Sequence, residues 1–267
     1  MTAQNKRESG LFLIATYVFS ALMWGALILM HQPPTSSAIA FALYLLGGLS
    51  PTIFALLLPL RSARGGRRAY YNRYFNFRVS MQWYVLPVVV ALLMKYMSDG
   101  FLYLFFRESL KPLNLQPWYM IFPLFIQMII GGGLEEIGWR GVLVHRYQRS
   151  NPALVALVIG VIWACWHIPL FFIQGVSQYN AEFLPFFINV IGLSFVTAVL
   201  YIRSQSAVPC IIFHALVNAL LGMGSISSSN PTANIIADIM KYAVVAVFFL
   251  AFSIKAADTA RMQQAQI

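Results

Sequence analysis

The chain has 267 residues, of which 60% are hydrophobic and 10% are charged. A soluble domain carries about 25% charged residues, so this composition excludes a soluble protein of ordinary type. The formal net charge of +10 does not indicate nucleic acid as a partner, because the basic residues follow the loop pattern of a membrane protein and suit lipid headgroups.

Apolar runs of roughly 20 residues recur along the whole chain, and a helix needs about that length to cross a bilayer. The runs are continuous rather than alternating, which predicts helices and not a β-barrel. We therefore expect an all-α polytopic membrane protein with residues 1–267 in a single transmembrane domain. The eight predicted spans are 10–30, 38–60, 81–104, 118–144, 152–173, 183–203, 207–223 and 234–254.

Two spans contain charges of opposite sign at helical spacing. Lys95 and Asp99 are four residues apart in the third span, and Asp238 and Lys241 are three apart in the eighth. Each spacing places both side chains on one helix face and predicts an ion pair. The first run is too long for a signal-peptide core, so we interpret it as a retained helix.

Basic residues alternate between loops and predict the orientation in the membrane. They precede the first span, fill the loop 61–79, and follow the fourth, sixth and eighth spans, whereas the intervening loops are poor in them. The positive-inside rule then places both termini in the cytoplasm. The segment 61–79 mixes arginines with aromatic residues, which fits either an interfacial stretch on the inner leaflet or a solvated basic loop.

The fourth span combines a long uncharged run with a cluster of charges. Residues 118–134 carry no charge, and Glu135, Glu136 and Arg140 follow them. A charge at mid-membrane costs about 2.5 to 3.5 kcal/mol on insertion scales, which makes ionisable residues there candidates for function. Glu136 and Arg140 are four residues apart and can pair. Glu135 is rotated by about 100° from Glu136 and is available to another partner; a buried network without chemistry is the alternative interpretation.

Two further spans contribute polar residues at helical spacing. Trp163 and His167 are four residues apart in the fifth span, and so are His214 and Asn218 in the seventh. Counted from the cytoplasmic span ends, Glu135, His167 and His214 lie roughly 16, 22 and 10 Å deep at 1.5 Å per residue. A common polar chamber open toward the cytoplasm is therefore geometrically allowed.

Such a chamber is suited to water activation. A carboxylate removed from water is a usable general base, and imidazole and amide groups can donate to a developing oxyanion. Glu135, His167 and His214 could alternatively provide three ligands to a catalytic Zn2+, although the sequence requires no cofactor. Neither HExxH nor G-x-S-x-G occurs, so the common zinc-protease and serine-hydrolase motifs are absent. The glycines at 131–133 indicate close helix packing or access for an extended substrate.

Together these motifs resemble the CAAX protease and bacteriocin-processing family of intramembrane endopeptidases, which includes the type II CAAX prenyl endopeptidases. The resemblance covers about residues 118–222 and depends on three ordered motifs: E-E-x-x-x-R at 135–140, an aromatic residue with His167, and His214 with Asn218. Trp163 stands where phenylalanine is common. The family implies an integral protein of a bacterial or archaeal plasma membrane and a membrane-anchored protein or peptide as substrate, for which a prenylated CAAX-type protein is one candidate.

The resemblance also implies roles for the site residues. Glu135 and His214 would activate the attacking water, His167 and Asn218 would stabilise the oxyanion, and Glu136 and Arg140 would organise the site. Two other functions remain as alternatives: an inactive relative acting as a bacteriocin-immunity or scaffold protein, and an ion or proton transporter. A transporter needs polar groups reaching both faces, and the first, second and sixth spans supply almost none.

Overall fold

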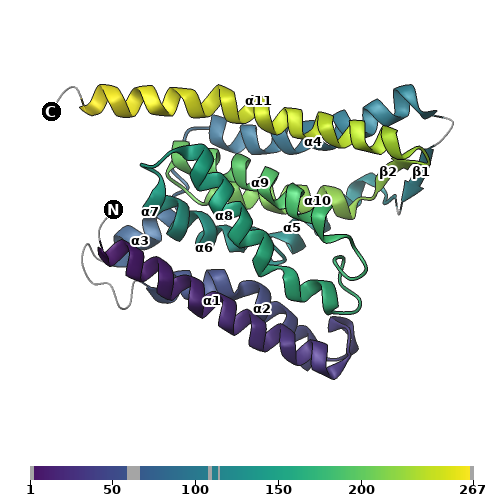
Figure 1. The fold of residues 1–267 in the computed structure, drawn as a ribbon, viewed down its shortest axis with the longest axis horizontal. Coiled ribbons are helices and arrows are strands. Elements are labelled where there is room, and N and C mark those ends of the chain that lie inside the picture. The colour runs from purple at the N-terminus through teal and green to yellow at the C-terminus, as the bar shows by residue number, and fades with distance from the viewer. Residues whose placement is uncertain (1–2, 59–66, 108–109, 114, 265–267) are drawn as a thin grey trace. The chain divides into compact units, whose positions relative to one another are not determined.

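The structure is a computed structural model that describes residues 3–58, 67–107, 110–113 and 115–264. Its contacts divide the chain into two compact units (Figure 1). Unit 1 comprises Met1–Arg78 and Leu134–Ile211, and unit 2 comprises Val79–Gly133 and Ile212–Ile267. Each unit is described by itself below.

Unit 1 is built from paired apolar helices. Its elements are α1 (Ala3–Met30), α2 (Ala38–Leu57), α3 (Arg67–Tyr74), α6 (Glu136–Gly138), α7 (His145–Tyr147), α8 (Pro152–Trp166), α9 (Phe183–Ser204) and the start of α10 (Val208–Gly222). Between α1 and α2, the Ser20 hydroxyl lies 2.9 Å from the Gly47 carbonyl oxygen and 2.6 Å from the Ser50 hydroxyl. A Cβ at Gly47 would lie 2.3 Å from the Trp24 indole nitrogen, so glycine allows this close approach. Such small and hydroxylated residues are typical of helix pairs in membranes.

Segments predicted to share the cytoplasmic side lie together at one end of unit 1. Arg146, after the fourth predicted span, forms an ion pair of 2.7 Å with Glu8 at the start of α1. Ser206, after α9, donates to the Asn76 carbonyl oxygen at 2.8 Å. These two contacts join segments that carry the basic residues of the predicted cytoplasmic loops.

The aromatic basic segment 61–79 is partly helical and partly packed into unit 1. Tyr74, at the end of α3, is fully buried and donates to the Ala55 carbonyl oxygen at 3.2 Å. Phe77 remains exposed. Residues 59–66 lie outside the described residues, so the choice between an interfacial and a solvated arginine loop stays open there.

Unit 2 contains α4 (Gln82–Phe105), β1 (Leu110–Leu113), α5 (Ile121–Ile130), the remainder of α10, β2 (Ser225–Ser228) and α11 (Pro231–Gln264). The helices α4 and α11 lie side by side (Figure 1), and Leu102 packs against Ala233 and Ala237 between them. The predicted ion pair of α4 is present: Lys95 Nζ lies 2.8 Å from Asp99 and also donates to the Gly224 carbonyl oxygen at 2.8 Å.

Two other features of unit 2 concern the sequence predictions. The Asp238–Lys241 pair of α11 is present at 2.9 Å. Strands β1 and β2 form a short antiparallel ladder, with Leu110 opposite Ser228, which the hydropathy pattern did not predict. The two strands leave the all-α class unchanged.

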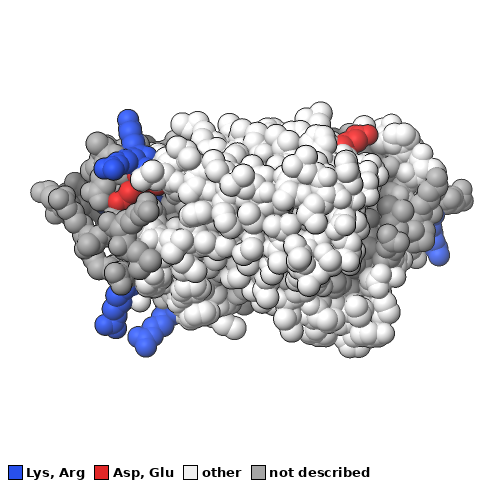
Figure 2. All heavy atoms as spheres, turned by 90° about the horizontal axis from the view of Figure 1, so that it is seen from below, with Lys and Arg blue, Asp and Glu red and all other residues white. Residues whose placement is uncertain are grey.

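The prediction of an all-α polytopic membrane protein is confirmed, but the number of long spans differs. Seven helices among the described residues are long and apolar enough to cross a membrane. The helix predicted over 207–223 forms as α10 but has only 15 residues, about 22 Å at 1.5 Å per residue, less than the roughly 30 Å of a bilayer core. On the face shown in Figure 2, a broad area without described charged side chains lies between groups of them.

The span predicted over 118–144 is not one continuous helix. α5 ends at Ile130, a turn follows at 131–132, and a 3₁₀ turn covers Gly133–Glu135. The chain then continues through α6, a π-helical turn over Trp139–Val144, and α7. Each glycine in a helix interior costs about 1 kcal/mol relative to alanine, so three in succession favour this break. The two glutamates consequently lie just after an interruption, where side chains and backbone are repositioned.

Candidate active site

The segment that carries the two glutamates is fixed against α2. The Thr52 hydroxyl donates to the Leu134 carbonyl oxygen at 2.7 Å, which links α2 to the backbone directly before Glu135. A Cβ at Gly138 would lie 2.7 Å from both the Cβ and the carbonyl oxygen of Pro51. Glycine at 138 therefore permits direct backbone contact, which holds the glutamates in place.

Glu136 and Arg140 form the predicted ion pair, and both are fully buried. Arg140 Nε lies 3.1 Å from Glu136 Oε2, and Nη1 lies 3.3 Å from Oε1. The guanidinium also lies over the Trp163 ring, 4.5 Å from its centroid, a favourable cation–π contact. The ion pair and the aromatic face of Trp163 thus compensate for the hydration that both charged side chains lose on burial.

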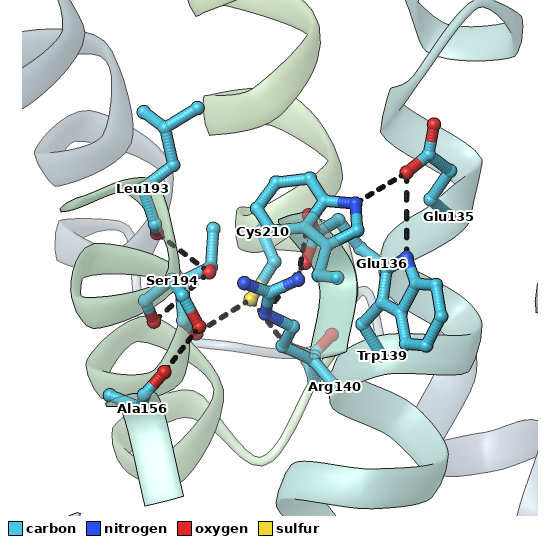
Figure 3. Close-up of polar contacts among 11 residues, drawn as sticks. Glu135, Glu136, Trp139, Arg140, Ala156, Leu193, Ser194 and Cys210 are labelled. Atoms are coloured by element: carbon cyan, nitrogen blue, oxygen red, sulfur yellow. Dashed lines mark hydrogen bonds and ion pairs between the residues drawn. The ribbon is translucent and has the colours of Figure 1, made fainter. Parts of the chain in front are cut away.

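Glu135 is held by different groups. Its Oε2 accepts hydrogen bonds from the indole N–H of Trp163 at 2.8 Å and of Trp139 at 3.4 Å. Figure 3 shows the two bonds meeting at one carboxylate oxygen. The side chain is buried. Both of these donors are neutral indole N–H groups, whereas Glu136 is paired with a cation.

His167 lies one helical turn beyond Trp163, at the end of α8. Its Nδ1 lies 2.8 Å from the Trp163 carbonyl oxygen. A carbonyl oxygen only accepts, so Nδ1 carries a proton and donates to it. The rings of Trp166 and Phe186 contact the imidazole, with centroids 4.7 and 5.1 Å away, and fix its plane.

His214 and Asn218 belong to unit 2 and lie on one face of α10. Both face Gly132: a Cβ at that position would lie 2.6 Å from Asn218 Nδ2 and 3.0 Å from His214 Nε2. His214 is buried. The turn at 131–132 therefore places backbone against two potential hydrogen-bond donors, and only glycine leaves room for them.

The six residues singled out from the sequence fall into two groups. Unit 1 contains Glu135, Glu136, Arg140 and His167, which the contacts above connect through Trp163, and unit 2 contains His214 with Asn218. Over the residues that the structure describes, no group of three or more histidine, cysteine, aspartate or glutamate side chains is arranged to hold a metal ion. The zinc alternative stays a prediction, and no step below passes through a metal.

Sequence reasoning did not identify two contributions to this site. The indole N–H donors of Trp139 and Trp163 carry no sequence signal beyond their aromatic character, although the spacing of Glu135 and Trp139 by four residues is visible. Gly132 was interpreted as a packing or access residue, and its contact with the α10 side chains depends on the turn that the hydropathy pattern did not indicate.

Comparisons with known proteins agree with these motifs. Residues 117–220 match the family model described as type II CAAX prenyl endopeptidase Rce1-like. A CAAX prenyl protease 2 of Methanococcus maripaludis is 24% identical over 232 residues, which covers 82% of this chain and 85% of the relative. The matched region contains all six residues singled out above and crosses from one unit to the other. Residues 117–220 thus form a domain of the Rce1-like type II CAAX prenyl endopeptidase family, and the predictions of a membrane-embedded peptidase and of its family are confirmed.

Proposed function

We propose that this protein cleaves a peptide bond of a membrane-anchored, prenylated CAAX-type protein or peptide with water activated by Glu135. The observation that carries this proposal is the buried Glu135 carboxylate, held by two neutral indole donors inside an apolar span. A carboxylate in such surroundings keeps the basicity needed to take a proton from water. The family match supports peptide hydrolysis and a protein substrate, and the names of the matched family and relative favour a prenylated one.

The local geometry favours a division of roles different from the one that the sequence resemblance implied. His167 belongs to the same unit as Glu135, and its ring is held by the contact of Nδ1 with the Trp163 carbonyl oxygen. Glu135 and His167 therefore suit the activation of water. His214 Nε2 and Asn218 Nδ2 face the same glycine, as paired donors to one oxyanion would. In this proposal His167 takes the water-activating role that the resemblance implied for His214, and His214 takes the oxyanion role.

The reaction then proceeds in two steps. The water oxygen attacks the acyl carbon as one water proton moves to Glu135, and the negative charge develops on the carbonyl oxygen, toward which His214 and Asn218 donate. The C–N bond then breaks, and Glu135 returns the proton to the leaving amine.

We further propose that both termini lie in the cytoplasm and that the site opens toward that side. The joint position of Glu8, Arg146, Asn76 and Ser206 at one end of unit 1 supports a common side for the basic segments. The positive-inside rule assigns that side to the cytoplasm. Labelling of single cysteines placed at the two ends of α1 with a membrane-impermeant reagent tests the orientation.

The two other functions considered from sequence are not favoured. An inactive immunity or scaffold protein would not need the complete set of motif residues that the family match includes. A transporter needs ionisable groups along a path to both faces. On α4 and on α11, each charged residue pairs with a residue of opposite charge on the same helix. These pairs do not provide such a path. Proton flux in liposomes would favour the transporter instead.

Cleavage of a fluorogenic prenylated peptide by the full-length protein in proteoliposomes tests the proposal. Glu135→Gln should abolish turnover, whereas the matched variant Glu182→Gln, which alters an exposed carboxylate, should leave it unchanged. Cleavage unaffected by Glu135→Gln would exclude the mechanism. An unprenylated peptide of the same sequence tests the substrate class.

Glutamine substitutions distinguish the roles of the two histidines. A glutamine amide can donate to an oxyanion but cannot accept a proton from water. His214→Gln should therefore retain part of the activity, and His167→Gln should not. The reverse order would restore the assignment implied by the sequence resemblance. Metal analysis of the same preparation tests the zinc prediction: one equivalent per chain, with loss of activity after chelation, would support it.

A further inference from the structure

Trp166 lies at the end of α8, directly before His167, and its indole ring contacts two groups of the candidate site. The imidazole of His167 packs edge to face against it, with centroids 4.7 Å apart and an angle of 78° between the planes. The ring of Trp139, whose N–H donates to Glu135, lies 5.6 Å away at 69°. The orientation of this one ring therefore affects the surroundings of both residues that the proposed mechanism assigns to water activation.

A hydroxyl group of α1 holds that ring. The Trp166 indole N–H donates to Ser20 Oγ at 2.8 Å, a good length for an N–H···O bond. Trp166 is 2% exposed and Ser20 is 1% exposed, so the bond is shielded from solvent. An indole N–H can only donate, and a buried donor without an acceptor is costly. Ser20 thus fixes Trp166 at the one ring atom that requires a hydrogen-bond partner.

Ser20 is itself held by α2. Its hydroxyl donates to the Gly47 carbonyl oxygen at 2.9 Å, because a carbonyl oxygen only accepts. This bond uses its single proton, so the contact of 2.6 Å with Ser50 Oγ is a bond that Ser50 donates. Oγ of Ser20 then accepts two hydrogen bonds and donates one, which fills its capacity and leaves it a single orientation.

This support comes from a part of the chain outside the family match. The matched residues 117–220 contain the site residues, whereas Ser20, Gly47 and Ser50 precede them. Hydroxyl groups between α1 and α2 would stabilise that helix pair without any contact to α8. The bond to Trp166 is the contact that extends their network to the candidate site.

We propose that Ser20 is a positioning residue for the reaction: by accepting the indole N–H of Trp166, it fixes the ring against which the His167 imidazole packs. This inference rests on the proposed peptidase mechanism. Without the hydroxyl group the indole can turn, and the imidazole loses a fixed support. Misplacement of a reacting group by about 1 Å can cost about 100-fold in rate, so a residue that acts through one intervening ring can affect kcat.

The first test compares Ser20→Ala with the matched variant Ser194→Ala in the proteoliposome assay. Ser194 is also fully buried in unit 1, and its hydroxyl donates to the Ala156 carbonyl oxygen at 2.9 Å. In Ser20→Ala, kcat should fall about ten-fold, and KM should change by less than about two-fold, because positioning acts on the chemical step. Ser194→Ala should change kcat by less than about two-fold, since it removes a similar bond away from the reacting groups.

The second test asks whether Ser20 acts through Trp166. Trp166→Phe removes the indole N–H and keeps an aromatic ring. If the hydroxyl acts through the indole, the double variant Ser20→Ala/Trp166→Phe should have a kcat within about two-fold of the lower single variant. Independent contributions would multiply instead, and that result would overturn the proposal.

The third test measures the link without relying on activity. In full-length protein labelled with 15N-tryptophan and 13C-histidine and held in nanodiscs, the ring signals of Trp166 and His167 are those missing from Trp166→Phe and His167→Gln. Ser20→Ala should shift both signals, because the indole loses its acceptor and its ring current at the imidazole changes. Ser194→Ala should shift neither.

The outcomes separate this inference from the proposed function. Unchanged kcat in Ser20→Ala, equal losses in both alanine variants, or a His167 signal that does not respond to Ser20→Ala would each overturn the positioning role. A wild-type protein that cleaves no prenylated peptide would instead overturn the proposed function, and the catalytic part of the inference with it. The two ring signals would still report whether Ser20 holds Trp166.

Discussion

Removing one charge of the buried Glu136–Arg140 pair should strongly destabilise unit 1. At the observed 3.1 Å, two unit charges attract by about 5 kcal/mol at an effective dielectric constant near 20. Arg140→Met abolishes this attraction and leaves the Glu136 carboxylate fully buried. It also removes the contact with the Trp163 ring, worth about 1 kcal/mol. We therefore expect a loss of about 3–5 kcal/mol, the usual cost of breaking a buried pair.

The double variant Glu136→Gln/Arg140→Met separates the cost of a lone charge from the loss of the pair. It contains no uncompensated charge, so it should recover at least half of the stability lost in Arg140→Met. Stability is measured by denaturant titration in nanodiscs, followed by tryptophan fluorescence. A loss below about 1 kcal/mol in Arg140→Met, or a double variant no more stable than the single one, would refute the reasoning.

Three further predictions concern close contacts and a partly buried ion pair. Gly132→Ala should slow peptide hydrolysis by about ten-fold or more with little change in KM, because its Cβ would lie 2.6 Å from Asn218 Nδ2; unchanged kcat would contradict this. Gly138→Ala should lower stability by about 1–3 kcal/mol, because its Cβ would lie 2.7 Å from the Pro51 backbone oxygen, and a thermal melt equal to wild type would contradict it. Lys95→Met should lower the free energy of unfolding by about 1–3 kcal/mol, because the Gly224 carbonyl and the Asp99 carboxylate both lose a donor at 2.8 Å. Amide hydrogen exchange should then rise first in the strand ladder of unit 2, and an exchange pattern equal to wild type would contradict this.

Most of the fold follows from hydropathy alone, because a membrane-spanning helix must satisfy its backbone internally and be apolar throughout. The ends of α10 are also indicated by the sequence, through residues that favour the start and the end of a helix. Pro209 stands at the start of the helix, and Gly224, with a positive φ of 91°, follows its end. Proline suits the first turn of a helix and glycine suits its termination. Polar residues lie close on either side, Ser206 before the helix and Ser225 after Gly224, so the predicted span over 207–223 is only slightly longer than α10.

The residues of the candidate site can be singled out from the sequence, but most of their contacts cannot. The spacing of Glu136 and Arg140 specifies their pair, since both lie on one helix face. The partner of Glu135 is not specified by spacing, because Trp163 lies 28 residues away on α8. Which indole donates depends on how α8 packs against the broken segment, and that follows from three-dimensional packing. In the same way, the close approach of Gly132 to His214 and Asn218 on α10 depends on the turn at 131–132, and residue spacing does not specify that turn.

Two adjacent carboxylates in one apolar span present the same electrostatic problem, and the chain resolves it in two ways. Glu136 is paired with a cation at 3.1 Å, which stabilises its buried charge. Glu135 accepts hydrogen bonds from two indole N–H groups, which orient its carboxylate. In the proposed mechanism the carboxylate held by the indoles takes the proton from water, and the carboxylate paired with the arginine stabilises the structure beside it.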